Sequence, residues 1–317
     1  MEEPAIAMLP SRSPAEMLRF TRASLIFNPA ARRMQADHGR LLQRLLSGLT
    51  AEGLEVHVTP TAGPGDATRL AREAVAARCE VVVTCGGDGT VNEVVCGMAG
   101  SDVPLLVIPG GTSNVLAREL GLPRDLPACA ALLRNGAVRR ISLGRAGERR
   151  FVLMAGIGVD AAIVAASNSG LKRTLGEGAF WLAGFQQLAQ YHFSPFDLIV
   201  DGTPHRGTFA LISKARHYGG PFQLTPHANL FSNQFAICLF QSQVRWRYLY
   251  YLSQVALGTH TSLPDVLMLK GRTIEAKGSA KVQVQVDGEL LGSLPQTISI
   301  QDNAISLVVP RARSTDF

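Results

Sequence analysis

Two patterns of apolar residues follow each other along the chain. From residue 24 to about residue 144, short apolar runs alternate with segments in which apolar residues recur every three or four positions. The runs predict strands at 24–28, 55–59, 81–85 and 105–109, and the periodic segments predict helices at 34–50, 66–78, 91–99 and 113–120. Strands and helices that alternate in this way build an α/β fold, here a doubly wound parallel sheet.

After Ile141 the pattern changes to β-type stretches with few helices between them. The predicted strands are 151–155, 197–200, 207–213, 235–240, 273–276 and 281–286, which favours a C-terminal domain built on a mainly antiparallel sheet. Two segments with helical spacing, 180–191 and 246–257, interrupt these strands and are rich in aromatic residues. We place the first domain at 20–145 and the second at 146–297, after a disordered leader at 1–19.

Composition fits two domains and a cytoplasmic protein. The chain has 317 residues, of which 46% are apolar, enough for two ordinary cores. No window reaches the roughly 18 uninterrupted apolar residues of a membrane-spanning helix, and the first residues carry no secretory signal. The five cysteines form no CxxC pair, so we expect them to be reduced.

Charge and aromatic residues narrow the choice of partner. A net charge of +6 suits a nucleotide, an acidic membrane surface or nucleic acid. The arginines are scattered and lack the aromatic interleaving of an RNA-binding sheet, so we predict no nucleic-acid partner. Sixteen of the twenty Phe, Trp and Tyr residues lie between residues 180 and 251. They fill the core of the second domain, or they also line an apolar substrate site.

The strongest chemical signal is Gly86-Gly87-Asp88-Gly89-Thr90, which follows an apolar strand and opens a helix. Small residues let backbone N–H groups approach phosphate oxygens, and a helix N-terminus adds partial positive charge. Asp88 would act through Mg²⁺ or orient the acceptor, although Asp between glycines is also a common turn residue.

A second glycine loop, residues 109–114, follows the next apolar strand. Thr112 or Ser113 would cap the following helix, bind a phosphate, or do both. The sequence has no GxxxxGK[ST] loop and no protein-kinase HRD or DFG set. Residues 156–161 fit GxGxxA but lack the βαβ context of a dinucleotide site.

Six segments follow one another along the chain in a characteristic order: 28–32, Thr61 with 65–67, 86–93, 109–114, 155–161 and 286–289. In this order they resemble the diacylglycerol kinase catalytic family, which includes sphingosine and ceramide kinases and soluble bacterial lipid kinases. The resemblance implies an ATP-dependent lipid kinase with a nucleotide-binding α/β domain, a β-sandwich domain and a final strand, at about 298–310, that returns to the first domain. The Gly-Gly-Asp-Gly-Thr stretch alone is shared with NAD kinases.

The resemblance also implies roles for single residues. Asp88 would serve the catalytic Mg²⁺ indirectly, and Glu289 would accept the proton of the lipid hydroxyl. Asp287, in the same Asp-Gly-Glu turn, is a rival for either role, and the turn is also typical of a plain β-hairpin. Contacts to ATP are implied for Asn28, Pro29, Ala30, Ala31, Arg32, Thr61, Gly87, Asp88, Gly89, Thr90, Val91, Asn92, Glu93 and Thr112.

One departure from the family concerns a second, structural Mg²⁺. Family members often carry an Asp-Gly pair after a Pro-x-Ala segment, and the Asp helps to bind this ion. Here Pro226-His227-Ala228 leads to Ser232-Asn233. The missing carboxylate argues against the structural metal, and only weak binding by backbone carbonyls is left.

A lipid acceptor calls for an apolar groove and for peripheral membrane contact. The aromatic segments 180–185 and 245–252 are candidates for both, or they cap the core of the second domain. Two other functions stay open: a soluble-substrate kinase similar to NAD kinases, and a non-catalytic lipid or nucleotide sensor. The sequence specifies neither the acceptor lipid nor the oligomeric state, for which a homodimer is one option.

Overall fold

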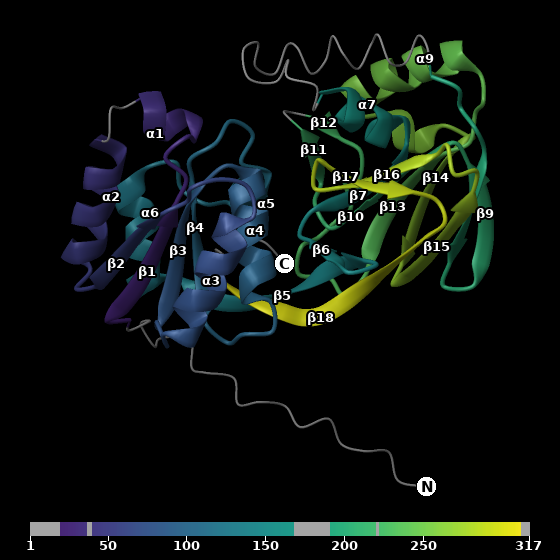
Figure 1. Cartoon of the computed structure of the whole chain (residues 1–317). Coiled ribbons are helices and arrows are strands. Elements are labelled where there is room, and N and C mark those ends of the chain that lie inside the picture. Colours follow the sequence, from purple (N-terminus) through teal and green to yellow (C-terminus); the bar gives the residue numbers. More distant parts are fainter. Residues whose placement is uncertain (1–19, 37–39, 168–190, 220–221, 312–317) are drawn as a thin grey trace, which may run out of the picture.

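The computed structural model describes residues 20–36, 40–167, 191–219 and 222–311 (Figure 1). These residues form two lobes that lie side by side, joined along one edge by two long strands. The leader predicted at 1–19 lies outside the described residues, as does the helix predicted at 180–191 apart from Tyr191. Among the described residues, no helix is long and apolar enough to cross a membrane.

The N-terminal lobe is the predicted doubly wound parallel sheet, with strand order β2-β1-β3-β4. Helices cover both faces, so every residue of β3 and β4 is buried. On one face α2 and α6 pack against Val83, and on the other α3 and α4 pack against Val82. The strands are β1 (Arg22–Phe27), β2 (Glu55–Pro60), β3 (Val81–Gly86) and β4 (Pro104–Pro109). The helices are α1 (Arg32–Ala36), α2 (Arg40–Ala51), α3 (Asp66–Ala76), α4 (Asp88–Met98), α5 (Val115–Glu119) and α6 (Leu126–Asn135).

The C-terminal lobe is a β-sandwich. One layer is a six-stranded antiparallel sheet, β14-β13-β10-β7-β16-β17, with bounds β7 (Met154–Gly158), β10 (Phe209–Ser213), β13 (Phe235–Phe240), β14 (Val266–Gly271), β16 (Gln283–Val286) and β17 (Glu289–Ser293). The other layer holds β8 (Phe196–Val200), β9 (Thr203–Gly207), β15 (Thr273–Gly278) and the start of β18 (Gln296–Val309). Between the layers lies a core that includes Ile157, Ile212, Ile237, Leu198 and Ile274.

Several short elements complete the C-terminal lobe. They are β6 (Arg149–Phe151), α7 (Val159–Ser167), β11 (His217–Gly219), β12 (Phe222–Gln223), α9 (Arg245–Ala256) and a 3₁₀ turn at His260–Ser262. Helix α9 covers the outer face of the six-stranded sheet, where Tyr248 and Tyr251 pack on Phe240.

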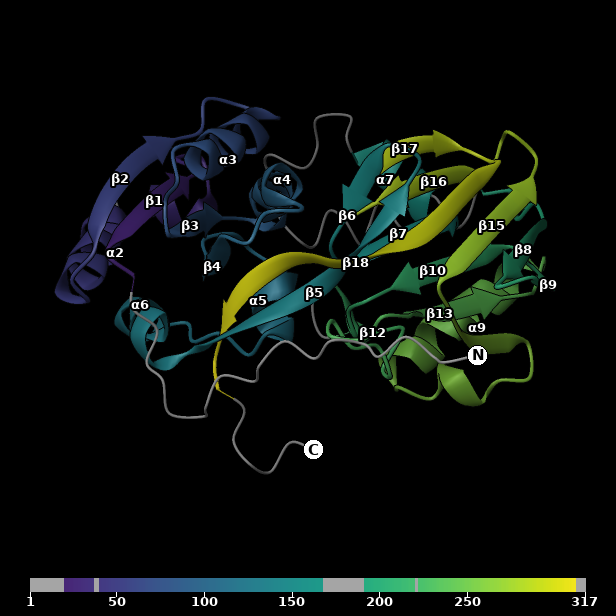
Figure 2. The same ribbon diagram turned by 90° about the horizontal axis from the view of Figure 1, so that it is seen from below.

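Strand β18 joins the two lobes (Figure 2). Its first residues pair with β15 in the C-terminal lobe, and Ser306 and Leu307 pair with β4 in the N-terminal lobe. On its other edge it pairs with β5 (Ala137–Ala146) along most of its length. The returning strand predicted at about 298–310 therefore corresponds to nearly the whole of this 14-residue strand, which starts in the C-terminal lobe and ends in the N-terminal lobe. Because one sheet runs through both lobes, their relative orientation is fixed by backbone hydrogen bonds.

Two of the predicted strands are wrong in extent, because each spans parts of two separate strands. The prediction at 207–213 is the end of β9 followed by β10, with a break at Thr208. The prediction at 151–155 is split into the end of β6 and the start of β7. The physical reason for the second break is that the N–H groups of Val152 and Leu153 point to the Asp287 carboxylate.

Candidate active site

Three loops meet at the carboxyl ends of β1, β3 and β4. The N–H of Asn28 donates to the Cys85 carbonyl (3.0 Å), and its side-chain amide donates to Thr90 Oγ1 (3.2 Å). The N–H of Gly110 donates to the Gly86 carbonyl (2.9 Å). Neighbouring parallel strands bring their following loops to one edge of the sheet, which is where open α/β sheets bind ligands. The fold therefore gathers the segments 28–32, 86–93 and 109–114.

The two glycine loops touch through their backbones. A Cβ atom added to Gly111 would lie 2.5 Å from the Cα of Gly87, and one added to Gly110 would lie 3.0 Å from the amide nitrogen of Gly86. Real Cβ atoms essentially never show the first distance, and the second is tighter than most of their contacts. Glycine is therefore required at residue 111 and favoured at residue 110 for the contact between the loops, in addition to any contact with a phosphate.

Asp88 and Glu93 both cap helices. The Oδ1 atom of Asp88 accepts a hydrogen bond from the N–H of Val115 (2.7 Å), the first residue of α5. The Glu93 carboxylate accepts from the N–H groups of Gly65 (2.8 Å) and Ala67 (3.1 Å), at the start of α3. Burial raises the pKa of Asp88, and the backbone N–H groups act in the opposite direction. Asp88 thus ties the first glycine loop to the helix that follows the second.

The other predicted nucleotide contacts surround these loops. Pro29, Ala30, Ala31 and Arg32 lie between β1 and α1, and Thr61 follows β2, where its N–H donates to the Phe27 carbonyl (2.9 Å). Thr112 lies in the second glycine loop, and Val91 and Asn92 lie in α4. Thr61 and Thr112 are brought to this set by the position of the backbone, since they lie in the loops that follow β2 and β4.

Arg33 is a residue of this edge that the sequence analysis did not select. Its guanidinium donates to the Pro109 carbonyl (2.6 Å), and its backbone N–H donates to the Gly110 carbonyl (3.1 Å). Arg33 therefore fastens α1 to the second glycine loop. Its position next to Arg32 is the only signal in the sequence.

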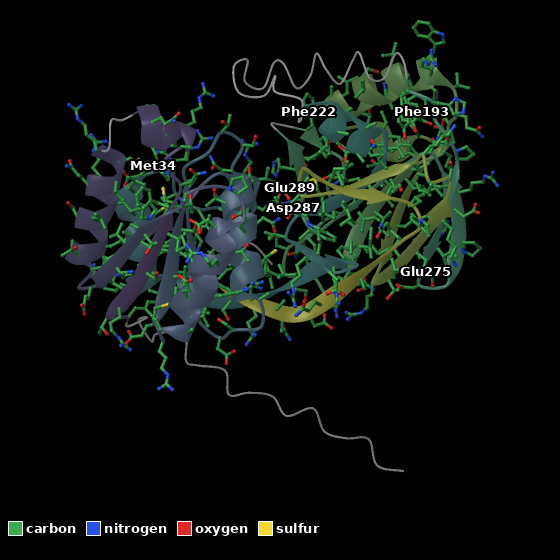
Figure 3. The ribbon with its side chains drawn as sticks, viewed as in Figure 1. Met34, Phe193, Phe222, Glu275, Asp287 and Glu289 are labelled. Atoms are coloured by element: carbon green, nitrogen blue, oxygen red, sulfur yellow. The ribbon has the colours of Figure 1, made fainter. Side chains whose placement is uncertain are left out.

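The Asp287–Gly288 pair forms the two-residue turn of the hairpin between β16 and β17. Val286 pairs with Glu289 across the turn, and both central residues have positive φ, 46° at Asp287 and 82° at Gly288. This is the backbone of a type I′ turn, which favours Asp-Gly. The turn lies on the side of the C-terminal lobe that faces the N-terminal lobe (Figure 3). It is thus both a plain hairpin turn and a candidate site.

The Asp287 carboxylate is held by the backbone. It accepts hydrogen bonds from the N–H groups of Val152 (2.7 Å), Leu153 (3.0 Å) and Met154 (2.9 Å). Burial raises the pKa of Asp287 to about 6; the three N–H groups oppose this shift, and the negative charge of Asp88 adds to it. The charge of Asp88 in the N-terminal lobe therefore acts on Asp287 in the C-terminal lobe.

Glu289 is more exposed and is held by a side chain. Its side chain is 50% exposed and forms an ion pair with Arg149 of β6. Arg149 was not selected from the sequence. The pair places one carboxylate and one guanidinium next to the Asp287–Gly288 turn.

A buried carboxylate supports the turn from behind. Asp160 accepts a hydrogen bond from the Tyr218 hydroxyl and one from the Gln285 side-chain amide (2.5 Å). The side-chain oxygen of Gln285, Oε1, in turn accepts a hydrogen bond from the N–H of Gly288 (2.8 Å). A Cβ atom at Gly156 would lie 1.7 Å from Asp160 Oδ2, so the glycine of the GxGxxA pattern makes room for this carboxylate. The pattern has a structural explanation, as its missing βαβ context indicates.

The pKa of Asp287 predicts a pH dependence of stability. An ordinary aspartate has a pKa of 3.8, whereas that of Asp287 is about 6. The folded chain binds this proton over a pH range in which the unfolded chain does not, so the group adds stability as the pH falls from about 6 towards 3.8. We expect wild type to gain free energy of unfolding relative to Asp287→Asn over this range, measured by urea unfolding. A difference that does not vary with pH would contradict the assignment.

Comparison with known proteins agrees with the resemblance found in the sequence. Residues 22–146 match the diacylglycerol kinase catalytic domain family, and residues 154–309 match the YegS C-terminal NAD kinase beta sandwich-like domain family. The chain is 30% identical to a diacylglycerol kinase of Bacillus subtilis, over 92% of this chain and 98% of the relative. It is also 30% identical to a diacylglycerol kinase of Mycobacterium tuberculosis, over 88% of this chain and 91% of the relative.

The fold is also shared with solved structures. A crystal structure of a diacylglycerol kinase from Bacillus anthracis superposes with a TM-score of 0.73, over 92% of this chain and 98% of that one, at 23% identity. This likeness confirms the predicted fold class, and the two matching families together cover both lobes. The chain belongs to the diacylglycerol kinase family and is a lipid kinase.

Proposed function

We propose that the protein transfers the terminal phosphoryl group of ATP to a hydroxyl of diacylglycerol or a related lipid. The observation that carries this proposal is the arrangement of two touching glycine loops on one lobe and an acidic turn on the other lobe that faces them. Phosphoryl transfer needs positioning and charge neutralisation more than covalent chemistry. On the nucleotide side, loops rich in backbone N–H groups would position the phosphates. On the other side, the acidic groups would supply a site for a metal ion and a base.

The nucleotide would bind at the edge formed by the β1, β3 and β4 loops. Asn28 and Thr90 already contact each other there, and Gly87 and Gly89 leave the phosphate loop open to a ligand. The remaining predicted contacts, Pro29, Ala30, Ala31, Arg32, Thr61, Val91, Asn92, Glu93 and Thr112, are assigned to the same edge by this proposal. Since its carboxylate caps α3, we assign Glu93 to holding the loop and not to ATP itself.

The acidic groups fit a magnesium ion brought in with ATP. Mg²⁺ commonly keeps several waters and binds through one or two carboxylates plus the substrate phosphates. Asp88 and Asp287 are two partly buried carboxylates, and the negative charge of Asp88 raises the pKa of Asp287, a repulsion that a cation between the lobes would relieve. Asp88 would hold the ion through water, and the ion would neutralise charge on the phosphates.

We assign the role of proton acceptor to Glu289. Three N–H groups occupy the Asp287 carboxylate, which makes Asp287 a positioning residue for the turn. Glu289 is half-exposed and pairs with the Arg149 guanidinium, so its carboxylate is able to reach an incoming hydroxyl. Arg149 would keep it aimed at the N-terminal lobe.

Lipid-dependent formation of ADP tests this function. Purified protein with ATP and Mg²⁺ should form ADP when diacylglycerol vesicles are added, and should not do so when NAD is added without lipid. The NAD arm separates the proposal from a soluble-substrate kinase, whose β-sandwich domain this chain shares. Phosphorylation of NAD in the absence of lipid would contradict it.

We further propose that α9 contacts the membrane that holds the lipid. The helix divides its aromatic residues between two faces: Tyr248 and Tyr251 are buried against the sheet, while Trp246 is 77% exposed and Tyr250 is 43% exposed. The exposed face and its flanks also carry Val244, Leu249, Leu257 and the exposed Arg245. Exposed aromatic and aliphatic side chains beside arginine suit the interface of an anionic bilayer.

A double variant, Trp246→Ala with Tyr250→Ala, is expected to lose most of its binding to anionic vesicles. It removes the two largest exposed rings of α9 and leaves the buried tyrosines in place, so the thermal midpoint should stay near that of wild type. Vesicle flotation measures binding. Val138→Ala, which truncates an apolar side chain that is 39% exposed on β5, is the matched control. Equal flotation of the double variant and the control would refute the contact.

A further inference from the structure

A buried lysine lies where the family would carry a structural metal. The side chain of Lys214 is fully buried, and its ammonium group donates a hydrogen bond to the backbone carbonyl of Ser232. By the resemblance in sequence, Ser232 corresponds to the position at which family members often carry the metal-binding aspartate. A positive charge thus contacts the loop after Pro226-His227-Ala228 from inside the protein.

A second cation contacts the same loop from outside. The Arg272 guanidinium donates to the Asn233 carbonyl (2.8 Å) and pairs with Asp302 (2.6 Å). Two consecutive carbonyls of the loop, those of Ser232 and Asn233, therefore each accept from a cationic side chain. Each of these carbonyls is thus held by a different positive charge that the chain itself supplies.

Polar atoms of the loop also form hydrogen bonds within the loop. Ser232 Oγ accepts from the N–H of Gln234 (3.1 Å), and Asn229 Oδ1 accepts from the N–H of Phe231 (2.9 Å). Among the described residues, no group of three or more His, Cys, Asp or Glu side chains is placed to hold a metal ion. The Ser232 hydroxyl and the Asn229 amide, the oxygens that would have to replace the lost carboxylate, are already acceptors within the loop. The residues present do not fit a structural Mg²⁺.

The electrostatics also oppose a divalent ion. Burial lowers the pKa of Lys214 to about 8, and Asp302 acts in the opposite direction. The group therefore stays mostly charged at neutral pH, and a divalent ion near the Ser232 carbonyl would meet its repulsion at short range. A buried charge is costly unless it is hydrogen-bonded, which makes the Ser232 carbonyl a necessary partner.

We propose that the Lys214 ammonium takes the place of the structural metal ion in this protein, so that the loop is ordered by a side chain of the chain itself. The proposal concerns the loop around Ser232 and does not depend on the transfer reaction.

The same lysine connects the loop to the candidate active site. The backbone N–H of Lys214 donates to the Leu153 carbonyl (2.8 Å), and the N–H of Leu153 donates to Asp287 Oδ1 (3.0 Å). The Ser232 loop, Lys214, Leu153 and the Asp287 carboxylate are thus linked by hydrogen bonds in series. The two bonds nearer to the turn are donated by backbone N–H groups, so a change of the Lys214 side chain leaves them in place and acts on the Ser232 loop.

Thermal unfolding of the nucleotide-free protein gives the first test. If the ammonium replaces the metal, the midpoint should be the same in EDTA and in millimolar Mg²⁺ or Ca²⁺. A rise with Mg²⁺ that persists in an Asp88→Asn variant would show a second metal site and overturn the proposal. This readout needs neither ATP nor lipid, so it is separate from any failure of the proposed function.

Exchange of the cation gives the second test. Lys214→Met keeps a long side chain but leaves the Ser232 carbonyl without its donor, so its midpoint should fall and Mg²⁺ should not restore it. Lys214→Ala combined with Ser232→Asp removes the ammonium and supplies a carboxylate. This double variant should regain stability in Mg²⁺, and calorimetry should detect a bound ion. Restoration of Lys214→Met by Mg²⁺, or no effect of Mg²⁺ on the double variant, would contradict the exchange.

Discussion

Replacement of Asp88 by asparagine is expected to abolish lipid phosphorylation while the chain stays folded. The Oδ1 atom of Asp88 caps α5 through the N–H of Val115, and an asparagine retains an oxygen for that bond. What it loses is the negative charge that we assign to the hydrated Mg²⁺ of ATP. Loss of one electrostatic group of this kind costs roughly 10²–10³-fold in turnover. The rate of ADP formation with diacylglycerol vesicles measures it.

The Asp88→Ala variant separates charge from capping. It removes both, so it should be as inactive as Asp88→Asn and in addition lose about 1 kcal/mol of stability with the cap. The two variants should therefore differ in thermal midpoint and have the same low rate. Near-normal turnover of a folded Asp88→Asn protein would refute the assigned role of the charge.

Glu289→Gln is expected to lower the rate of transfer by roughly 10²–10⁴-fold, the contribution of a well-placed general base. Glutamine keeps the size of the side chain and an oxygen for Arg149, but it does not take a proton from the lipid hydroxyl. Binding of ATP should be unaffected, because the turn belongs to the other lobe. Single-turnover transfer of phosphate from labelled ATP isolates the chemical step.

Glu275→Gln is a matched control for Glu289→Gln. Glu275 is also a half-exposed carboxylate on a strand of the C-terminal lobe, with its side chain 44% exposed and paired with Lys277 (2.7 Å). It lies on the far side of this lobe from the turn (Figure 3). Its replacement should leave transfer unchanged, since it is remote from both glycine loops. Equal rates for the two variants would show that Glu289 does not act as the base.

The parts of the fold that follow from local patterns were predictable. Strands β1, β3 and β4 are mostly apolar because helices bury both of their faces, and their following loops must share one edge. The Asp-Gly turn was equally readable, because only a few residue pairs tolerate positive φ at both positions.

Contacts between distant segments were not predictable. Asp160, Tyr218 and Gln285 meet through three different elements, and none of them belongs to a sequence pattern that names the others. The same holds for Arg149 with Glu289 and for Lys214 with Ser232. Arginines and lysines normally point into water, so a sequence gives no sign that one of them is used inside a lobe.

The predicted domain boundary also depends on contacts between distant segments. A break near residue 145 follows from the change in apolar pattern, but β5 and β18 cross from one lobe to the other without interruption. The pattern of apolar and polar residues along β18 does not separate its two halves. Only the strands they pair with, β15 at one end and β4 at the other, assign each half to a lobe. Pairing partners are a property of the folded sheet.

Transfer of labelled phosphate tests the central proposal most directly. Protein is incubated with ATP labelled in the terminal phosphate, Mg²⁺ and vesicles that contain diacylglycerol within a mixed lipid extract, and the labelled product is identified by mass. The account predicts a phosphorylated lipid formed in step with ADP, and its loss in Asp88→Asn and Glu289→Gln. Folded wild-type protein that binds ATP but labels no lipid would contradict it, as would label that appears only on a soluble acceptor.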